Sequence, residues 1–475
     1  MDTTTETLPV QWADSAFLQS LAAKRPSYDE RLAAGKQLRS QVPRAAHAEY
    51  TPPRDRDPIA IIEEQAKSRL PQLVPIRHAR MLASPFAFLR GAAAVMIADI
   101  ASAPVTGLNV QACGDMHVSN FGVFASAERN LIFGINDFDE TLPGPWEWDL
   151  KRLVASAVVS VRYLGGDEAD GETAARRVVK TYRKRMRHYA KMGHLELWYA
   201  TIDDRDVLDA LSSRATKNAK KIMAKARRRT HLQVLEKMSS LIDDKLRIVE
   251  EAPLIVRETR THAGRPIVEA IDSIFRSYLD SLALDRRQLL LRYQIVDVAR
   301  KVVGVGSVGT RCWVTLFKGA DNDDPLFLQL KEAQTSVLAP YVRSVSSYAN
   351  EGQRVVVGQR IIQGAPDIFL GWCEAEGLHF YMRQLRDMKG GLDFVPGEVD
   401  LDNYVEYCGL CGWALALAHA KSGDPAMIAG YCGKSDELDE AMAAFGRAYA
   451  DQTEEDHATM AAAAKSGRLE VASTV

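Results

Sequence analysis

Three polar side chains suited to catalysis lie within six residues of the segment CGDMHVSNFGVF, residues 113–124. They are Asp115, His117 and Asn120, and apolar residues flank them on both sides. A further carboxylate, Asp137, follows Asn120 by 17 residues in the segment INDFDE. Phosphoryl transfer needs one carboxylate to orient or deprotonate the attacking hydroxyl, and an amide with a second carboxylate to hold Mg²⁺. The spacing favours such a site, although Asp and Asn are also common in ordinary polar turns.

A third element, Trp148-Asp149-Leu150, opens a predicted helix, with Asp149 twelve residues after Asp137. With this element the segment resembles the aminoglycoside and choline kinase branch of the protein-kinase-like superfamily, which carries G-D-x-H-x-x-N, then I-D-F-[DE], then D-L. Cys113 departs from that pattern, because the branch usually has His there. The resemblance implies Asp115 as catalytic base, Asn120 and Asp137 as Mg²⁺ ligands, and Asp149 as anchor of the loop. We also place His117 in the catalytic site, where it is expected to orient the loop rather than react, and we expect Asp139 to help hold the metal.

A glycine-rich segment, VVGVGSVG at residues 302–309, spaces Gly304, Gly306 and Gly309 as G-x-G-x-x-G around Ser307. The main alternative is a Rossmann turn, which requires a helix directly after the glycines. Here the following segment, RCWVTLF, is β-branched and aromatic and predicts a strand. A strand, a glycine loop and a second strand are the kinase arrangement, in which the loop folds over the nucleotide phosphates.

Lys331 lies 22 residues past Gly309, on the apolar strand LFLQLKEA. A charge on such a strand costs free energy unless it is paired. In a kinase its partners are the nucleotide phosphates and a helix carboxylate, and the sequence offers Glu332 or Glu351 for the latter. The competing interpretation is a lysine at a strand end that reaches solvent.

The order of these parts is rotated relative to a kinase, where the nucleotide lobe comes first. Two strands, DIFLGWC and LHFYMRQL, follow a helical stretch at about 335–363, and the connector that meets adenine is expected at 382–385, including Gln384. We therefore expect an α+β, two-lobed, circularly permuted kinase-like fold. Its predicted parts are an N-terminal arm (1–60, with a helix near 27–40), a helical large lobe with the catalytic loop (61–290), a β-rich nucleotide lobe (291–400) and C-terminal helices (401–475).

The pattern as a whole also resembles an uncharacterised bacterial family, known as domain of unknown function two-two-five-two. The matching segments include RHARMLASPFAFLRG, INDFDETLPGPWEWDLKRL, KVVGVGSVGTRCW and RAYADQTEEDH, and they cover most of the chain. That resemblance supports a shared fold and brings no established substrate.

Composition excludes several other classes of protein. The 475 residues are 47% hydrophobic and 26% charged with a net charge of −2, which argues against a nucleic-acid or membrane partner. Six cysteines without a secretion signal favour the cytoplasm. Cys408 and Cys411 have metal or redox spacing but favour a helix core, and the basic run 217–229 favours a solvated helix face over a grip on acidic partners.

The expected function is an ATP- and Mg²⁺-dependent phosphotransferase that acts on a hydroxyl of an unidentified small molecule or protein. Nucleotidyl transfer on the same groups remains open. The alternative is a nucleotide-binding pseudokinase or regulatory scaffold without catalysis. A second His-x-x-x-x-Asp pattern, His419 to Asp424, is rejected as the catalytic loop because Ala429 stands where a metal ligand is needed.

Overall fold

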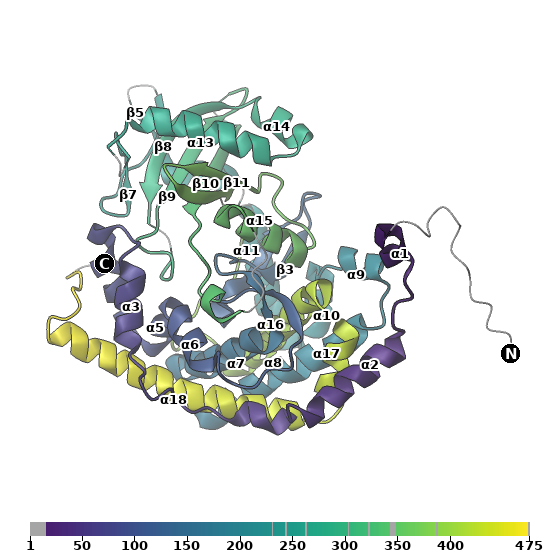
Figure 1. Ribbon diagram of the computed structural model, residues 1–475. Helices are drawn as coiled ribbons and strands as arrows, with labels where there is room; N and C mark the ends of the chain where they lie inside the picture. The colour runs from purple at the N-terminus through teal and green to yellow at the C-terminus, as the bar shows by residue number, and fades with distance from the viewer. Residues whose placement is uncertain are drawn as a thin grey trace.

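The computed structural model describes residues 16–473, except 230, 243–244, 262–263, 303, 322–323, 343–347 and 386–387. Within these residues the predicted α+β class is confirmed: a large body of helices lies on one side and a six-stranded sheet with its own helices lies on the other (Figure 1). Residues 1–15 of the expected arm lie outside the described part, as do parts of the expected turn at 319–325 and Val303 next to the glycine loop.

Long, largely apolar helices form the core of the helical body. Helix α7 (Trp146–Leu164) is buried along almost its whole length, and α8 (Glu168–Tyr189) and α18 (Glu437–Lys465) pack against it. Helix α16 (Leu401–Ser422) lies on α8 and approaches it closely, because a Cβ at Gly412 would lie 2.2 Å from the Val178 carbonyl oxygen. Figure 1 shows α18 running along the bottom of this body.

The N-terminal helices wrap the body and end beside the sheet. The helix expected near 27–40 is confirmed as α2 (Tyr28–Gln37), which begins with a capping box at Ser27 and packs on α17 (Pro425–Cys432). The remaining N-terminal helices are α1 (Ala16–Ala22), α3 (Pro58–Ala66), α4 (Val74–Leu82), α5 (Pro85–Gly91) and α6 (Ala93–Ile100).

Two small antiparallel ladders precede α7 and position the motif loop. Strand β1 (Asn109–Ala112) pairs with β4 (Leu142–Pro145), and β2 (Phe121–Ala125) pairs with β3 (Leu131–Ile135). The sequence of residues 107–138 predicts short strands with a hairpin turn at 127–130, and both are confirmed. Residues 113–120 therefore run between β1 and β2, at the face of the helical body nearest the sheet.

The six-stranded sheet is antiparallel throughout, in the order β11-β12-β10-β9-β8-β7. Leu328 and Leu330 on β10 join a core with Tyr278 of the covering helix α13, so Lys331 projects from the opposite face. The expected hairpin across residues 374–377 is confirmed. The strands are β7 (Ile255–Val256), β8 (Gln294–Lys301), β9 (Cys312–Lys318), β10 (Pro325–Glu332), β11 (Gly371–Ala375) and β12 (Leu378–Gln384).

Two expected helical regions differ from the structure. The sequence favours helices through residues 148–300, and most of that range is helical. After α7 and α8 come α9 (His194–Tyr199), α10 (Asp204–Ala210), α11 (Ser213–Arg228), α12 (His231–Met238), α13 (Ile267–Ser281) and α14 (Leu284–Leu290). The same range also contains strands β5 (Ser239–Ile242), β6 (Lys245–Ile248), β7 and β8. Ile248 of β6 and Ile255 of β7 pack with Val314 and Leu316 of β9 and so cover part of the sheet. Burial on a sheet, rather than helix propensity, decides that segment.

The helix expected at 335–363 begins only at Glu351, as α15 (Glu351–Ile362). Asn350 sets the start of this helix, because its side chain accepts a hydrogen bond from Gln353 N and so caps the first turn. Upstream, only residues 339–341 form a short 3₁₀ turn, and 343–347 lie outside the described residues. None of the helices in the described part of the chain combines the length and apolar character that crossing a membrane requires.

Candidate functional site

The motif loop is anchored by Asp149, as the resemblance implies. Asp149 lies in the first turn of α7, and its carboxylate accepts hydrogen bonds from Cys113 N at 2.7 Å and Gly114 N at 2.9 Å. His419, from the rejected second motif, lies 3.2 Å from the same carboxylate through Nε2 and supports it from behind. The start of the loop is thereby fixed to the most buried helix of the body.

Asp115 is held by an arginine that sequence reasoning missed. Arg152 Nε donates to Asp115 Oδ1 at 2.8 Å, and its Nη2 contacts the same oxygen. Burial raises the pKa of Asp115 above its usual range, although the Arg152 guanidinium opposes this. The signal was present in the sequence, since Arg152 follows Asp149 by three residues and so projects from the same face of α7.

His117 lies beside Asp115 as a neutral side chain. It is 3% exposed, and its Nε2 is 3.8 Å from Asp115 Oδ2. Burial, with Arg90 and Arg152 nearby, holds the pKa of His117 far below its ordinary value. An imidazole that stays neutral cannot supply a proton near pH 7, which favours the predicted supporting role over a reactive one.

Asn120 and Asp137 are brought together by the β2–β3 hairpin. Asn120 Nδ2 donates to the Asp115 carbonyl oxygen at 2.7 Å, and the Asn120 carbonyl accepts from Asn136 N at 2.8 Å. Asp115, Asn120 and Asp137 all line one cavity of about 110 Å³. Burial raises the pKa of Asp137, and the neighbouring Asp139 carboxylate raises it further.

Lys331 reaches this site from the far half of the chain. Its Nζ lies 2.6 Å from Asp139 Oδ2, and the Tyr381 hydroxyl donates to Asp139 Oδ1 at 2.6 Å. Burial disfavours charge on both partners, but their mutual attraction holds the pKa of Asp139 below and that of Lys331 above the ordinary values. Lys331 is 2% exposed, so the alternative of a lysine reaching solvent does not hold.

The partners expected for Lys331 were wrong. Glu332 pairs with Arg311 at 3.1 Å, and Glu351 pairs with Arg354 at 2.5 Å. Asp139 was expected to help bind metal, and both of its carboxylate oxygens already contact Lys331 or Tyr381. Each glutamate has an arginine nearer to it than Lys331. For Glu351 this is Arg354, one turn further along α15.

The glycine loop covers the cavity and is tied to the N-terminal helices. Gly304, Gly306 and Ser307 line the cavity, and Ser307 Oγ donates to Asp139 Oδ2 at 3.3 Å. Gly309 has φ +92°, a conformation that side chains other than glycine rarely adopt. Three hydrogen bonds hold the loop down: Leu70 N to Gly309 O at 2.8 Å, Arg69 Nη1 to Val308 O at 2.5 Å and Arg80 Nη1 to Gly304 O at 2.6 Å.

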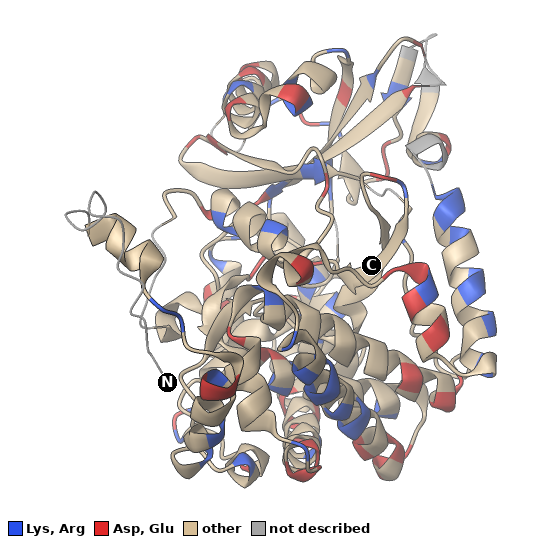
Figure 2. Cartoon of the chain, turned by 90° about the vertical axis from the view of Figure 1, so that its right-hand side faces the viewer, with Lys and Arg blue, Asp and Glu red and all other residues tan. Residues whose placement is uncertain are grey.

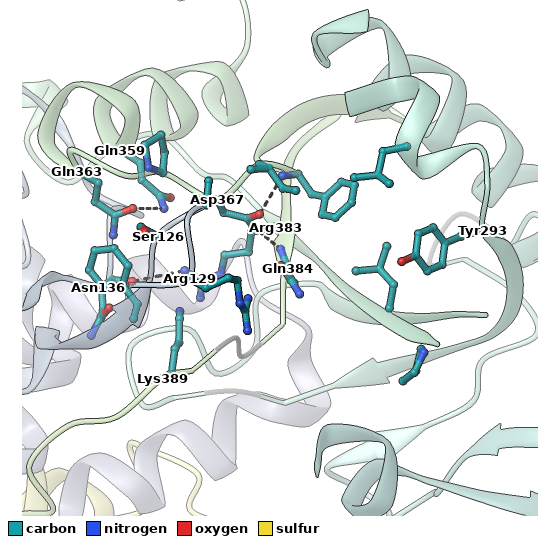
Figure 3. Close-up of a pocket in the computed structure, with 18 of the residues that line it drawn as sticks. Ser126, Arg129, Asn136, Tyr293, Gln359, Gln363, Asp367, Arg383, Gln384 and Lys389 are labelled. Carbon is teal, nitrogen blue, oxygen red and sulfur yellow. Dashed lines mark hydrogen bonds between the residues drawn. The ribbon is translucent and has the colours of Figure 1, made fainter. Parts of the chain in front are cut away.

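The expected connector does not join this cavity. Met382 packs in the core beneath α13, and Leu385 packs with Val314 and Leu316 under β9. Gln384 lines a separate cavity of about 280 Å³, where its backbone N–H donates to Asp367 (Figure 3). Of the predicted nucleotide-binding residues, Gly304, Gly306 and Ser307 thus line the cavity of Asp115, whereas Gln384 lines the other cavity.

Between the two cavities lies Arg383, which sequence reasoning also missed. Its guanidinium donates to Gln329 Oε1 at 3.2 Å and to the Asn136 carbonyl at 3.4 Å, and it lowers the pKa of Asp139. Its position two residues past Tyr381 on β12 puts both side chains on one face of the strand. The alternation of side chains along LHFYMRQL predicts this shared face, but which face turns toward Asp139 depends on the sheet.

Two other sequence features sit away from the cavity. Cys408 and Cys411 are buried on α16 as free thiols, and no group of three or more metal-binding side chains of the His, Cys, Asp and Glu types occurs among the described residues. The basic run 217–229 forms most of α11, whose blue residues follow the helix at the right-hand edge of Figure 2. Arg227 pairs there with Asp204 and Lys225 lies 3.7 Å from Asp393.

Comparison with known proteins identifies the family of the chain. The family described as "Uncharacterized protein conserved in bacteria (DUF2252)" matches residues 69–463. Since this match covers most of the chain, the protein belongs to that family. No curated protein and no solved structure matches the chain.

Proposed function

We propose that this member of the family is an ATP- and Mg²⁺-dependent phosphotransferase with a circularly permuted kinase-like arrangement. The observation that carries the proposal is the 2.6 Å contact between Lys331 Nζ and Asp139 Oδ2, which joins residues 192 apart in sequence. Asp139 lies two residues past Asp137, so the lysine strand faces the predicted metal carboxylate. A kinase-type site needs this juxtaposition of a strand lysine and a metal-binding loop.

The order of elements in the sheet gives further support. Strand β8, the glycine loop, β9, the Lys331 strand β10, helix α15 and strands β11 and β12 follow one another. The resemblance leads one to expect this order in a nucleotide lobe. Helix α16 follows, where the first helix of a large lobe is expected.

Asp115 would start the reaction by accepting the proton of the acceptor hydroxyl. Its Oδ1 is occupied by Arg152, whereas Oδ2 faces the glycine loop, where a Cβ on Gly306 would lie 3.9 Å away. The acceptor oxygen would then bond to the γ-phosphorus of ATP while the bond to the bridging β–γ oxygen breaks, and ADP leaves. The raised pKa of Asp115 suits a group that must take up a proton.

The residues present fit a Mg²⁺ ion that is shared with a nucleotide. Mg²⁺ typically takes one or two carboxylates and completes its shell with water and phosphate oxygens. Asp137 forms no ion pair with a cation in the described part of the chain, and both it and Asn120 line the cavity. When bound, the ion would neutralise charge on the phosphates, and Asp137 and Asn120 would hold it.

The second candidate is a nucleotide-binding protein without catalysis, and the small cavity bears on both candidates. About 110 Å³ is less than the 300–1,000 Å³ usual for a small-molecule site. A nucleoside triphosphate therefore requires the glycine loop to rise and to break its contacts with Arg69, Leu70 and Arg80. A protein whose glycine loop stays closed would bind no nucleotide, and neither candidate would then hold.

Binding and turnover separate the two candidates. We expect Mg·ATP to raise the melting temperature, because a ligand that binds only the native state stabilises it. Mg²⁺ alone and ATP with EDTA are the controls. Asp115→Asn should retain the shift and lose ATP turnover on an acceptor. If neither Mg·ATP nor Mg·GTP shifts the melting temperature, both candidates fail; if Asp115→Asn keeps full turnover, the assignment of the base fails.

A further inference from the structure

Three arginines line the cavity of Asp115 without an acidic partner. Arg69, Arg77 and Arg90, called here the arginine set, come from the segment that contains α4 and α5 and lie on the side of the helical body. Within the described part of the chain none of them forms an ion pair with a carboxylate: they donate to backbone carbonyls or an amide, or stack on Phe86. By contrast, Arg152 and Lys331 each have a carboxylate partner.

Burial makes these missing partners costly. Arg77 is fully buried, and its Nε and Nη1 have no hydrogen-bond partner. Arg69 is 8% exposed, and Nε of Arg69 and of Arg90 also lacks a partner. A buried charge is normally paired or hydrogen-bonded, so three guanidinium groups that line one cavity without a carboxylate partner indicate an anion there.

The position of the set relative to Asp115 points to the acceptor side. Arg90 lines the same cavity as Asp115 and Asp137, and among charged groups these two carboxylates, Asp115 first, act most strongly on Arg90. Lys331, Ser307 and the backbone of the glycine loop already offer donors for nucleotide phosphates next to Asp139. The arginine set is a second group of donors, carried by different helices and adjoining the predicted base.

We infer that the arginine set binds a phosphate group carried by the acceptor, so that the substrate is a phosphorylated compound with a free hydroxyl. This inference rests on the proposed function, because only a phosphotransferase has an acceptor substrate. Guanidinium groups recognise phosphate through paired N–H donors, and three of them at one cavity suit a dianion better than a single carboxylate. The hydroxyl of such a compound would lie at Asp115 Oδ2 while its phosphate is held by the arginine set.

Inorganic phosphate is the first probe, used on the full-length protein by thermal shift and calorimetry. At constant ionic strength we expect phosphate to raise the melting temperature in a saturable way and sodium chloride to have no such effect. Acetate should act more weakly, because one carboxylate brings half the charge. The absence of a saturable phosphate effect, or an equal effect of acetate, would overturn the inference.

Arg90→Gln is the decisive variant because Arg90 is the most accessible member of the set. Losing a charge-assisted hydrogen bond should weaken phosphate binding by about tenfold or more. Arg162→Gln is the matched control, since Arg162 pairs with Asp451 and Glu454 on the surface, and it should bind phosphate as the wild type does. Unchanged phosphate affinity in a folded Arg90→Gln protein contradicts the inference.

A third arm separates this inference from the proposed function. With a saturating non-hydrolysable Mg·ATP analogue, phosphate should still bind wild type, and Arg90→Gln should bind the analogue normally. If the analogue abolishes phosphate binding and Arg90→Gln weakens both, the set holds nucleotide phosphate, and the inference fails while the proposed function stands. If phosphate binds and the analogue does not, the proposed function fails and the anion site remains.

Discussion

Lys331 and Arg77 are both buried cations close to one cavity, but only Lys331 has a carboxylate partner. Lys331 contacts Asp139 at 2.6 Å, whereas Arg77 donates to the Gly91 carbonyl at 2.8 Å and to Gln65 at 3.1 Å. On the sheet side of the cavity the charge of Lys331 is thus balanced by a carboxylate, whereas on the side formed by the N-terminal helices the charge of Arg77 is not. A cation that serves the stability of the fold tends to be paired with a carboxylate of the chain, whereas a cation that serves a ligand tends to be left unpaired beside a cavity.

The largest effect is expected from removing the paired cation. Lys331→Met leaves Asp139, whose side chain is only 26% exposed, without its cation, which should cost up to about 3 kcal/mol of unfolding free energy. Chemical denaturation measures this. The double variant Lys331→Met, Asp139→Leu should recover much of the loss, because no buried charge is left over. A double variant as unstable as the single one would contradict the pairing.

A buried acid that lacks a strong cationic partner gives the next effect. Glu147 is fully buried, accepts hydrogen bonds from Thr106 through Oε1, and has no partner at Oε2. Burial raises its pKa to about 7, and the nearby Lys151 lowers it only partly. Because the native state then binds the proton more tightly than the unfolded chain, wild-type stability from this group is lost as pH rises from about 4.5 to 7.

Glu147→Gln tests that linkage. The variant should be the more stable protein above pH 7, by up to about 3 kcal/mol, and the difference should shrink toward pH 5. Subtracting the two profiles removes the titration of groups that do not interact with Glu147; Lys151 does interact with it, so its pKa of about 8 should fall further in the variant. A difference that is constant with pH would show that Glu147 does not titrate in this range.

Removing the unpaired cation should change the unfolding free energy by less than either of these substitutions. Arg77→Met loses two hydrogen bonds to neutral acceptors but also removes a buried charge that no acid balances, and the two terms have opposite signs. We expect the unfolding free energy to stay within about 1 kcal/mol of wild type. A loss as large as that of Lys331→Met would mean that Arg77 is a structural cation and would weaken the contrast.

The smallest effect is expected on α11. Lys221→Gln and Lys225→Gln change exposed residues of the basic run, where single substitutions usually stay within about 0.5 kcal/mol. The thermal response to Mg·ATP should also be unchanged. A lost response would assign α11 to ligand binding and would overturn its interpretation as a solvated face.

Local features of the sequence could be predicted better than long-range pairings. The β2–β3 hairpin, the Lys331 strand and the Asp149 anchor follow from alternation, turn residues and a spaced motif. The partner of Lys331 could not be found, because Asp139 is 192 residues away and two nearer glutamates have the right chemistry. The expected adenine contact at Gln384 failed to join the cavity for a related reason: which face of β12 turns inward depends on the sheet.

The distance in sequence between Asp139 and Lys331 also has a meaning in time. During synthesis at 5–20 residues per second, the 192 residues that separate them take roughly 10–40 s to appear. Throughout that interval the motif loop can already pack on α7, while Asp139 stays hydrated because Lys331 has not yet been synthesised. The last charge neutralisation at the cavity is therefore a late event in the life of each new chain, set by the ribosome rather than by the loop itself.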